Sequence, residues 1–160
     1  MPNPTTAPDL PRELRALVGT VSAPRTRAVH PHDVHRFVLA IADGTGAGST
    51  DPAVVPAAGS VAPPTFFCPD PLVTAAELGL VRPRPLPRNI DGGTEWEIHR
   101  PVRVGDTLTS IARIADISQR TTADGRPMVF TVIEVSVWNQ RGESVGVARG
   151  TSVSYQERAA

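Results

Sequence analysis

The residues with the clearest potential for chemistry lie at positions 30–35, in the segment HPHDVH. His30, His32, His35 and Asp33 all have side chains of types that bind metal ions. Their spacing argues against a metal centre, because only His32 and His35 share a face of the helix expected here and no distant ligand is evident. We therefore favour a solvated helix end, and we predict no metal site and no cofactor.

The single cysteine, Cys68, stands between Phe67 and Pro69. A reactive thiol needs a nearby basic group to lower its pKa, and none is evident in this segment. A small buried hydrophobic residue is the better interpretation. A single cysteine also excludes an internal disulfide framework and a multi-cysteine metal centre. It fits a reducing compartment, so we expect a cytoplasmic protein.

Charge and length limit the remaining classes of function. The 160 residues include 16 basic and 16 acidic ones, so no net field attracts nucleic acid or an anionic membrane. No segment approaches the ~18 consecutive apolar residues of a membrane span. The length suits one domain with its own core. Because the start of the chain is rich in proline and threonine, we expect a flexible arm over residues 1–14 and one domain over 15–156.

Two helices are expected in the first half of the chain. Asp43-Gly44 suits the end of the first helix, and the irregular segment 44–64 suits a long loop where a ligand could bind. Asp70 can cap a short, mostly apolar second helix that closes at Gly79. The first helix is indicated by helical spacing of Val34, Phe37, Val38 and Ile41.

The second half of the chain predicts an antiparallel meander. Trp96 and Ile98 alternate with polar residues, which predicts a half-buried strand. Asp124-Gly125 and Arg141-Gly142 suit hairpin turns between consecutive strands. Helices followed by an antiparallel sheet define an α+β domain, with the short apolar helix enclosed by the sheet. Strands are expected at 95–99, 108–118 (with a bulge), 128–138 and 145–155.

The segment 89–108 concentrates residues that shape a backbone. Gly92-Gly93 would let the chain bend into the sheet. Pro101 would stop strand pairing, and Gly105-Asp106 would form the turn into the next strand. Most of this segment is therefore expected to have a structural role rather than a role in binding or catalysis.

Three segments occur in a characteristic order: VAPPTFF, NIDGGTEWEIHRPVRVGDTL and GRPMVFTVIEVSVWNQRGESVGVARGTSV. Together they resemble the N-terminal, fatty-acid-synthase-like half of the MaoC dehydratases, a branch of the hot-dog fold, over about residues 15–155. The resemblance implies one antiparallel sheet wrapped around a short central helix. It also implies a homodimer, or a heterodimer with another hot-dog subunit, that closes the exposed sheet edge.

The resemblance implies reversible addition of water to a 2-enoyl-CoA or an enoyl-carrier-protein. That reaction needs an acid and a base, an ordered water, and donors to the thioester oxygen. Arg100 and Arg103 are expected mainly as architecture, with binding of a carrier phosphate as the alternative. The family takes its donors from the N-terminus of the buried helix, so the expected substrate-binding residues there are Phe66, Phe67, Cys68 and Leu72.

The catalytic loop of the family carries an Asp, then Asn-Pro, then a His, after the first long helix. Asp43 matches, whereas the Asn, Pro and His are absent from residues 44–48. Asp43 is thus a candidate catalytic residue, with a helix-capping role as the alternative. His99 is a second candidate, with a structural or interfacial role as the alternative.

Three functions stay open on these grounds, in fatty acid or polyketide metabolism. The first is an acyl thioester dehydratase or enoyl hydratase, active alone or as one subunit of a heteromeric enzyme. The second is a non-catalytic acyl-binding partner of a catalytic hot-dog chain. The third is a hot-dog thioesterase, for which Glu77 is the one acidic candidate on the short helix.

Overall fold

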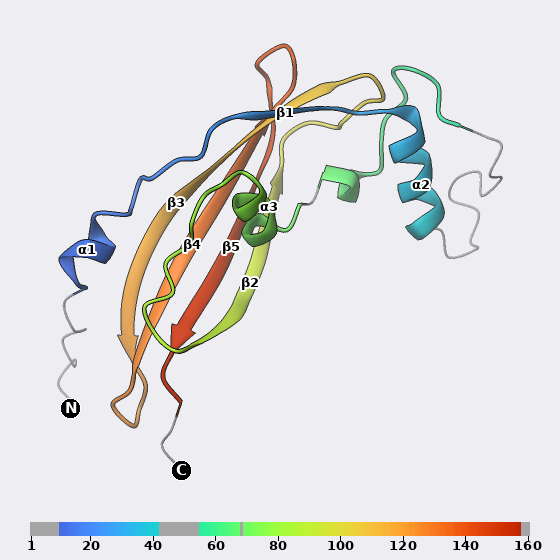
Figure 1. Ribbon diagram of the computed structural model, residues 1–160. Coiled ribbons are helices and arrows are strands. Elements are labelled where there is room, and N and C mark those ends of the chain that lie inside the picture. The colour runs from blue at the N-terminus through green and yellow to red at the C-terminus, as the bar shows by residue number, and fades with distance from the viewer. Residues whose placement is uncertain (1–9, 42–54, 68, 158–160) are drawn as a thin grey trace.

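The computed structural model describes residues 10–41, 55–67 and 69–157. Five strands form one antiparallel sheet in the order β1-β3-β4-β5-β2 (Figure 1). The strands are β1 (Arg25–Ala28), β2 (Arg88–Ile98), β3 (Thr107–Thr121), β4 (Pro127–Trp138) and β5 (Ser144–Tyr155). The helices are α1 (Arg12–Arg15), α2 (Pro31–Ile41), the 3-10 helix η1 (Pro64–Phe67) and α3 (Pro71–Glu77).

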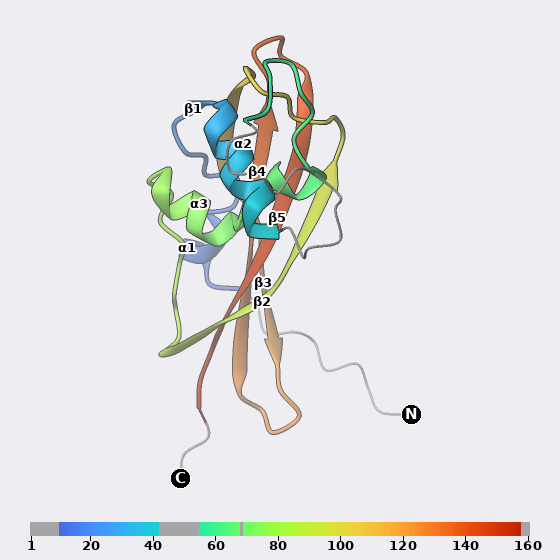
Figure 2. The same cartoon turned by 90° about the vertical axis from the view of Figure 1, so that its right-hand side faces the viewer.

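The sheet curves around α3, which contacts β3, β4 and β5 (Figure 1). Figure 2 shows α3 standing out from one face of the sheet. As predicted, Asp70 caps this helix, and its carboxylate accepts hydrogen bonds from the N–H groups of Leu72 and Val73. Pro71 and Ala75 are buried against the sheet, whereas Val73 faces away and is exposed. This arrangement confirms the predicted α+β hot-dog fold.

The three central strands agree with the sequence pattern. The expected bulge in β3 lies between Ile114 and Asp116, where the pairing with β4 shifts by one residue. Gly125 and Gly142 form the two predicted hairpin turns with φ of 81° and 73°. The β-branched side chains on the α3 side supply most of the core, including Ile114, Ile133, Val135, Val137 and Val145.

The strand order differs from a simple meander. The pairing β3-β4-β5 is consecutive, but β2 pairs with β5 at the far edge instead of with β3. The segment 99–106 therefore connects strands that do not touch each other. The predicted strand 95–99 is also too short, because β2 begins at Arg88 and ends at Ile98.

The predicted half-burial of β2 is wrong. Trp96 and Ile98 are each 46% exposed, because β2 is the outermost strand and α3 packs on the strands beside it. The Trp96 indole N–H still donates to the carbonyl of Pro69, which ties the edge strand to the segment before α3. The alternation of apolar and polar residues predicted the strand correctly, but it did not predict that the apolar side chains are exposed.

The expectation of a loose arm over residues 1–14 is wrong for residues 10–14. Leu10 and Leu14 pack against the core, and residues 12–15 form α1. The short strand β1 was not expected either. Its four residues are all exposed, so they carry no alternating pattern.

The segment 89–108 acts largely as predicted. Gly93, with φ of 120°, lies at a bulge in β2, and its N–H donates to the Asp91 carboxylate. Pro101 follows the end of β2. Gly105, with φ of 94°, forms the turn into β3, and the carboxylate of buried Asp106 accepts a hydrogen bond from the Arg103 N–H.

A row of alternating charges crosses the face of the sheet opposite α3, here called the outer face. Glu134 on β4 accepts hydrogen bonds from Arg113 on β3 and Arg149 on β5, each at 2.8 Å. Arg149 continues the row to Glu97 on β2 at 3.3 Å and to Glu95 at 4.0 Å. The Glu134 side chain is 9% exposed, so its charge depends on the two arginines.

Acid should weaken the fold through this row. Burial alone raises the pKa of Glu134, but the hydrogen bonds from Arg113 and Arg149 outweigh it and hold the pKa below its usual range. A lowered pKa stabilises the fold above the unfolded value of about 4.3, and this stabilisation is lost as pH falls through the folded value. In urea unfolding between about pH 7 and about pH 3, Glu134→Gln should lose less stability than the wild type. Parallel curves would show that Glu134 does not contribute.

Candidate functional site

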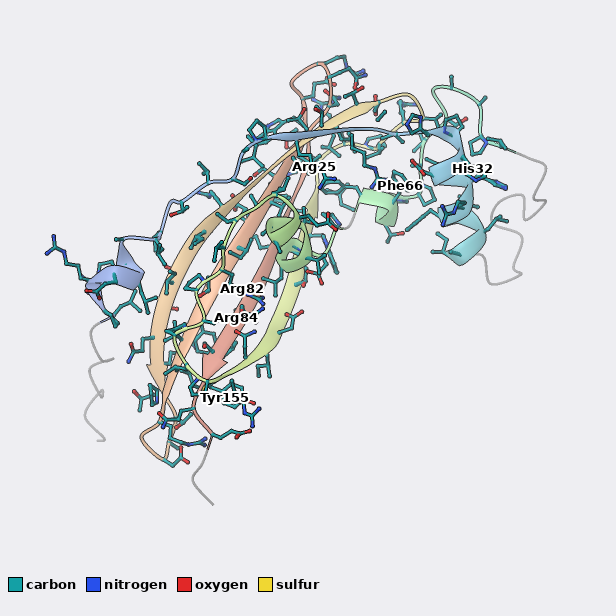
Figure 3. The ribbon with its side chains drawn as sticks, viewed as in Figure 1. Arg25, His32, Phe66, Arg82, Arg84 and Tyr155 are labelled. Atoms are coloured by element: carbon teal, nitrogen blue, oxygen red, sulfur yellow. The ribbon has the colours of Figure 1, made fainter. Side chains whose placement is uncertain are left out.

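The short helix η1 lies between α2 and the sheet and carries the two aromatic residues expected to bind substrate. Figure 3 shows Phe66 between η1 and α2. Its ring lies edge-on to Phe37 of α2, with centroids 5.5 Å apart. Phe67 is buried. Both rings line a cavity between η1 and the strands, and each also lines a second space of its own.

Two glycines of β5 allow the helical layer to approach the sheet closely. A Cβ atom at Gly146 would lie 2.5 Å from the Phe67 ring and 2.5 Å from the carbonyl oxygen of Glu97. A Cβ atom at Gly150 would lie 3.2 Å from side-chain carbons of Pro71 and Leu72. Close approach of this kind requires glycine at position 146.

The inner cavity, of about 180 Å³, lies between η1 and the strands. Its wall is mostly apolar, and Ser110 of β3 and Arg27 of β1 are its polar members. Such a space suits an apolar group with a polar end. Its lining residues are Arg27, Val29, Phe66, Phe67, Pro69, Leu108, Ser110 and Val137.

The arginine hollow, of about 400 Å³, adjoins the inner cavity and shares Arg27 and Phe66 with it. Arg27 and Arg36 bring two guanidinium groups to this hollow from β1 and α2, whereas Asp33 brings one carboxylate. The local balance is therefore positive, which favours an anion such as a phosphate. The lining is completed by Phe37 and Phe66.

The edge cavity, of about 290 Å³, shares Phe67 with the inner cavity and lies beside the end of β2. It brings together two residues singled out in the sequence, His99 and Arg100. The remaining lining is apolar or backbone: Val61, Ala62, Pro64, Phe67, Ile98, Pro101 and Val102.

His99 makes two contacts with its own chain. Its Nδ1 lies 2.7 Å from the Ser144 hydroxyl and its Nε2 lies 3.0 Å from the Glu97 carboxylate. Hydrogen bonding from His99, then from Arg149, lowers the pKa of Glu97. These contacts orient the imidazole along the sheet edge.

The two candidate arginines differ in their surroundings. Arg100 lines the edge cavity and lies 3.9 Å from Glu143. Its side chain is 56% exposed and is therefore accessible to a ligand. Arg103 donates through its guanidinium to the carbonyl of Gly59 and through its N–H to Asp106. Arg103 therefore has the architectural contacts that the sequence favoured.

The N-terminus of α3 differs from the expectation that its N–H groups are free to donate to a thioester oxygen. The N–H of Leu72 donates to Asp70 at 2.8 Å, so this N–H already has an acceptor. The side chain of Leu72 packs near Gly150. Leu72 thus packs between α3 and β5 in the described structure.

Asp43 and Cys68 lie outside the described residues. Within the described ranges, no group of three or more His, Cys, Asp or Glu side chains is placed to hold a metal ion. The expectation of a solvated helix end is wrong for His35, which packs into the protein and is buried. Its Nε2 lacks a hydrogen-bond partner in that part of the chain, and its ring lies 6.5 Å from that of His32. No helix in the described ranges is long and apolar enough to cross a membrane.

Sequence reasoning missed the arginine hollow. Arg36 was visible as a residue one helical turn after Asp33, on a helix that was predicted. Arg27 carried no signal, because β1 has only four exposed residues and its position at the sheet edge depends on pairing with β3. Arg27 and Phe66 meet only once the strands are assembled.

Comparisons with known proteins agree with this architecture. A UPF0336 protein from Saccharopolyspora erythraea is 31% identical over 113 residues, which is 65% of this chain and 67% of that protein. The HadBC (3R)-hydroxyacyl-ACP dehydratase complex of Mycobacterium tuberculosis contains a similar chain, with a TM-score of 0.58 and 22% identity over 86% of this chain and 96% of that one.

The ChsH1-ChsH2 complex of Mycobacterium tuberculosis contains another similar chain, with a TM-score of 0.59 and 18% identity over 92% of this chain and 90% of that one. At these identities the two solved structures support the fold. The model of the FAS1-like dehydratase domain region matches residues 16–147, most of the chain. Two MaoC-like dehydratases, at 18% and 24% identity, share the same fold. The chain therefore belongs to the family of the FAS1-like dehydratase domain region.

Proposed function

We propose that this chain binds a 2-enoyl or 3-hydroxyacyl thioester along η1, as a MaoC-like dehydratase or hydratase that works as a dimer or in a heteromeric enzyme. The observation that carries the proposal is the junction of the inner cavity and the arginine hollow at Arg27 and Phe66. One side of that junction is apolar and the other is cationic. An acyl thioester on a phosphate-bearing carrier has the same division.

In this assignment the acyl group occupies the inner cavity and the carrier phosphates lie in the arginine hollow. Arg27 and Arg36 then bind phosphate oxygens, and Phe37 and Phe66 cover the apolar part of the carrier. Arg100 remains a second candidate for a phosphate contact, at the edge cavity. Water adds to the double bond as hydroxide at Cβ and a proton at Cα, and elimination reverses both transfers.

The supply of acid and base separates the two leading functions. Asp43 keeps its proposed catalytic role. His99 is the weaker catalytic candidate, because its ring nitrogens lie within hydrogen-bond distance of Ser144 and Glu97. The acid and base would then come from Asp43 or, in the second function, from a partner subunit. Glu77, the thioesterase candidate, is exposed, lies 3.9 Å from Arg25 and lines none of the three cavities.

Binding is tested by calorimetric titration of crotonyl-CoA into the purified chain. Arg27→Gln and Arg36→Gln should each raise Kd by about tenfold, because each removes a charge-assisted hydrogen bond to phosphate. Arg84→Gln is the matched control, since Arg84 lies over the sheet, away from Phe66 (Figure 3). Equal affinities for all four proteins would contradict the assignment of the arginine hollow.

Turnover is followed by the loss of enoyl absorbance from crotonyl-CoA. Activity of the chain alone that disappears in Asp43→Asn would support catalysis by this chain. Binding without turnover would support the acyl-binding subunit. Release of free thiol would instead indicate a thioesterase.

A further inference from the structure

The inner cavity is small for a ligand pocket. Its volume of about 180 Å³ lies below the range of roughly 300–1,000 Å³ that is usual for sites of small organic ligands. In the proposed function this cavity receives the acyl group, and its size leaves room for a short chain only. A longer acyl chain therefore needs further apolar space that continues from the inner cavity.

The edge cavity contains apolar space of this kind. Its volume of about 290 Å³ exceeds that of the inner cavity, and its wall is apolar except at His99 and Arg100. The ring nitrogens of His99 lie within hydrogen-bond distance of Ser144 and Glu97, neither of which lines this cavity. The Arg100 side chain is 56% exposed. The rest of the wall suits the methylene groups of an alkyl chain.

Phe67 belongs to both cavities. Among the described residues it is the only one that lines the two of them. Phe67 is 5% exposed, and its ring lies so close to β5 that a Cβ atom at Gly146 would be 2.5 Å from Cε1 and 3.1 Å from Cζ. The backbone of β5 therefore limits the movement of the ring and holds it where the two cavities meet.

We propose that the Phe67 ring forms the end of the acyl site and thereby restricts this chain to short acyl thioesters. The inference rests on the proposed function, in which the acyl group occupies the inner cavity. With the ring in place, the edge cavity is not part of the acyl site. A smaller side chain at this position joins the two cavities, and the joined space falls within the usual size range of ligand pockets.

Chain-length preference is measured by calorimetric titration with crotonyl-CoA and with trans-2-octenoyl-CoA. The wild type should bind octenoyl-CoA no more tightly than crotonyl-CoA, because the additional methylene groups find no apolar space. In Phe67→Leu, the ratio of Kd for octenoyl-CoA to Kd for crotonyl-CoA should fall by about tenfold, since each buried methylene group strengthens binding severalfold. Leucine is chosen because it keeps more of the core packing than alanine does.

Two further variants test whether this gain comes from the edge cavity. Ile98→Trp places a larger side chain in that cavity from an exposed position at the end of β2, so adding it to Phe67→Leu should remove most of the gain. Phe130→Leu is the matched control, because it makes the same change on β4, next to Arg120, at a side chain that lines none of the three cavities. It should keep the wild-type ratio.

The wild type alone already tests the proposal, so the result does not depend on the folding of Phe67→Leu. A wild type that binds octenoyl-CoA about tenfold more tightly than crotonyl-CoA would overturn it. An unchanged ratio in Phe67→Leu would overturn it as well. Both results leave the binding of crotonyl-CoA through Arg27 and Arg36 intact, whereas failure of every thioester to bind would overturn the proposed function and this inference together.

Discussion

Alanine at position 146 is expected to lower the free energy of unfolding by about 3 kcal/mol, the upper range for overpacking a core. The added Cβ would lie 2.5 Å from both the Phe67 ring and the carbonyl oxygen of Glu97. The Phe67 ring would have to move, and the carbonyl belongs to the backbone of the adjacent strand β2, which would have to shift as well. Urea unfolding followed by tryptophan fluorescence measures the loss.

Gly125→Ala is the comparison for this substitution. Gly125 has open space around its Cα, so alanine there incurs only the strain of φ at 81°, about 1 kcal/mol. The two variants separate crowding from backbone strain. Equal losses would show that η1 adjusts freely and that Gly146 does not set its position.

Asp106→Ala should also lower the free energy of unfolding by about 3 kcal/mol, because two charge-assisted hydrogen bonds to a buried carboxylate are lost. Its carboxylate accepts hydrogen bonds from the Arg103 N–H at 2.8 Å and from the Gln140 amide at 3.0 Å. These bonds join the turn before β3 to the β4–β5 hairpin. Thermal unfolding should show the loss without a change in strand content by circular dichroism.

Two further substitutions make this result specific. Asp106→Asn keeps one acceptor oxygen and should lose about half as much stability, whereas exposed Asp116→Ala should change it by less than about 0.5 kcal/mol. A loss of the same size for Asp106→Asn and Asp106→Ala would indicate that the charge matters rather than the bridge between the turns.

Local patterns in the sequence predict most elements of this fold. Asp70 was identified as a cap from its position before Pro71, and the glycines at 125 and 142 were identified as turns, because each depends on neighbours in the chain. The family resemblance supplied the enclosing sheet. Properties set by distant partners were harder: alternation at Trp96 and Ile98 is the same for a central strand and an edge strand.

In the candidate site, too, the sequence predicted what depends on local pattern or family resemblance and missed what depends on distant partners. Phe66 and Phe67 were identified through the resemblance, and the structure places both in the wall of the inner cavity. Arg27 was missed because its strand has no pattern of its own. The contacts of His99 depend on the pairing of β2 with β5, which brings Ser144 to its ring. Long-range register, rather than local preference, decides these contacts.

The two glycines on the inner side of β5 indicate how the size of the inner cavity could differ among hot-dog chains. Gly146 lies under Phe67, and Gly150 lies under Pro71 and Leu72. In a relative with a side chain at position 146, η1 would have to lie farther from the sheet. The inner cavity between η1 and the strands would then be deeper. The depth of the inner cavity would therefore depend on the size of residue 146, although no residue of β5 is among those that line it.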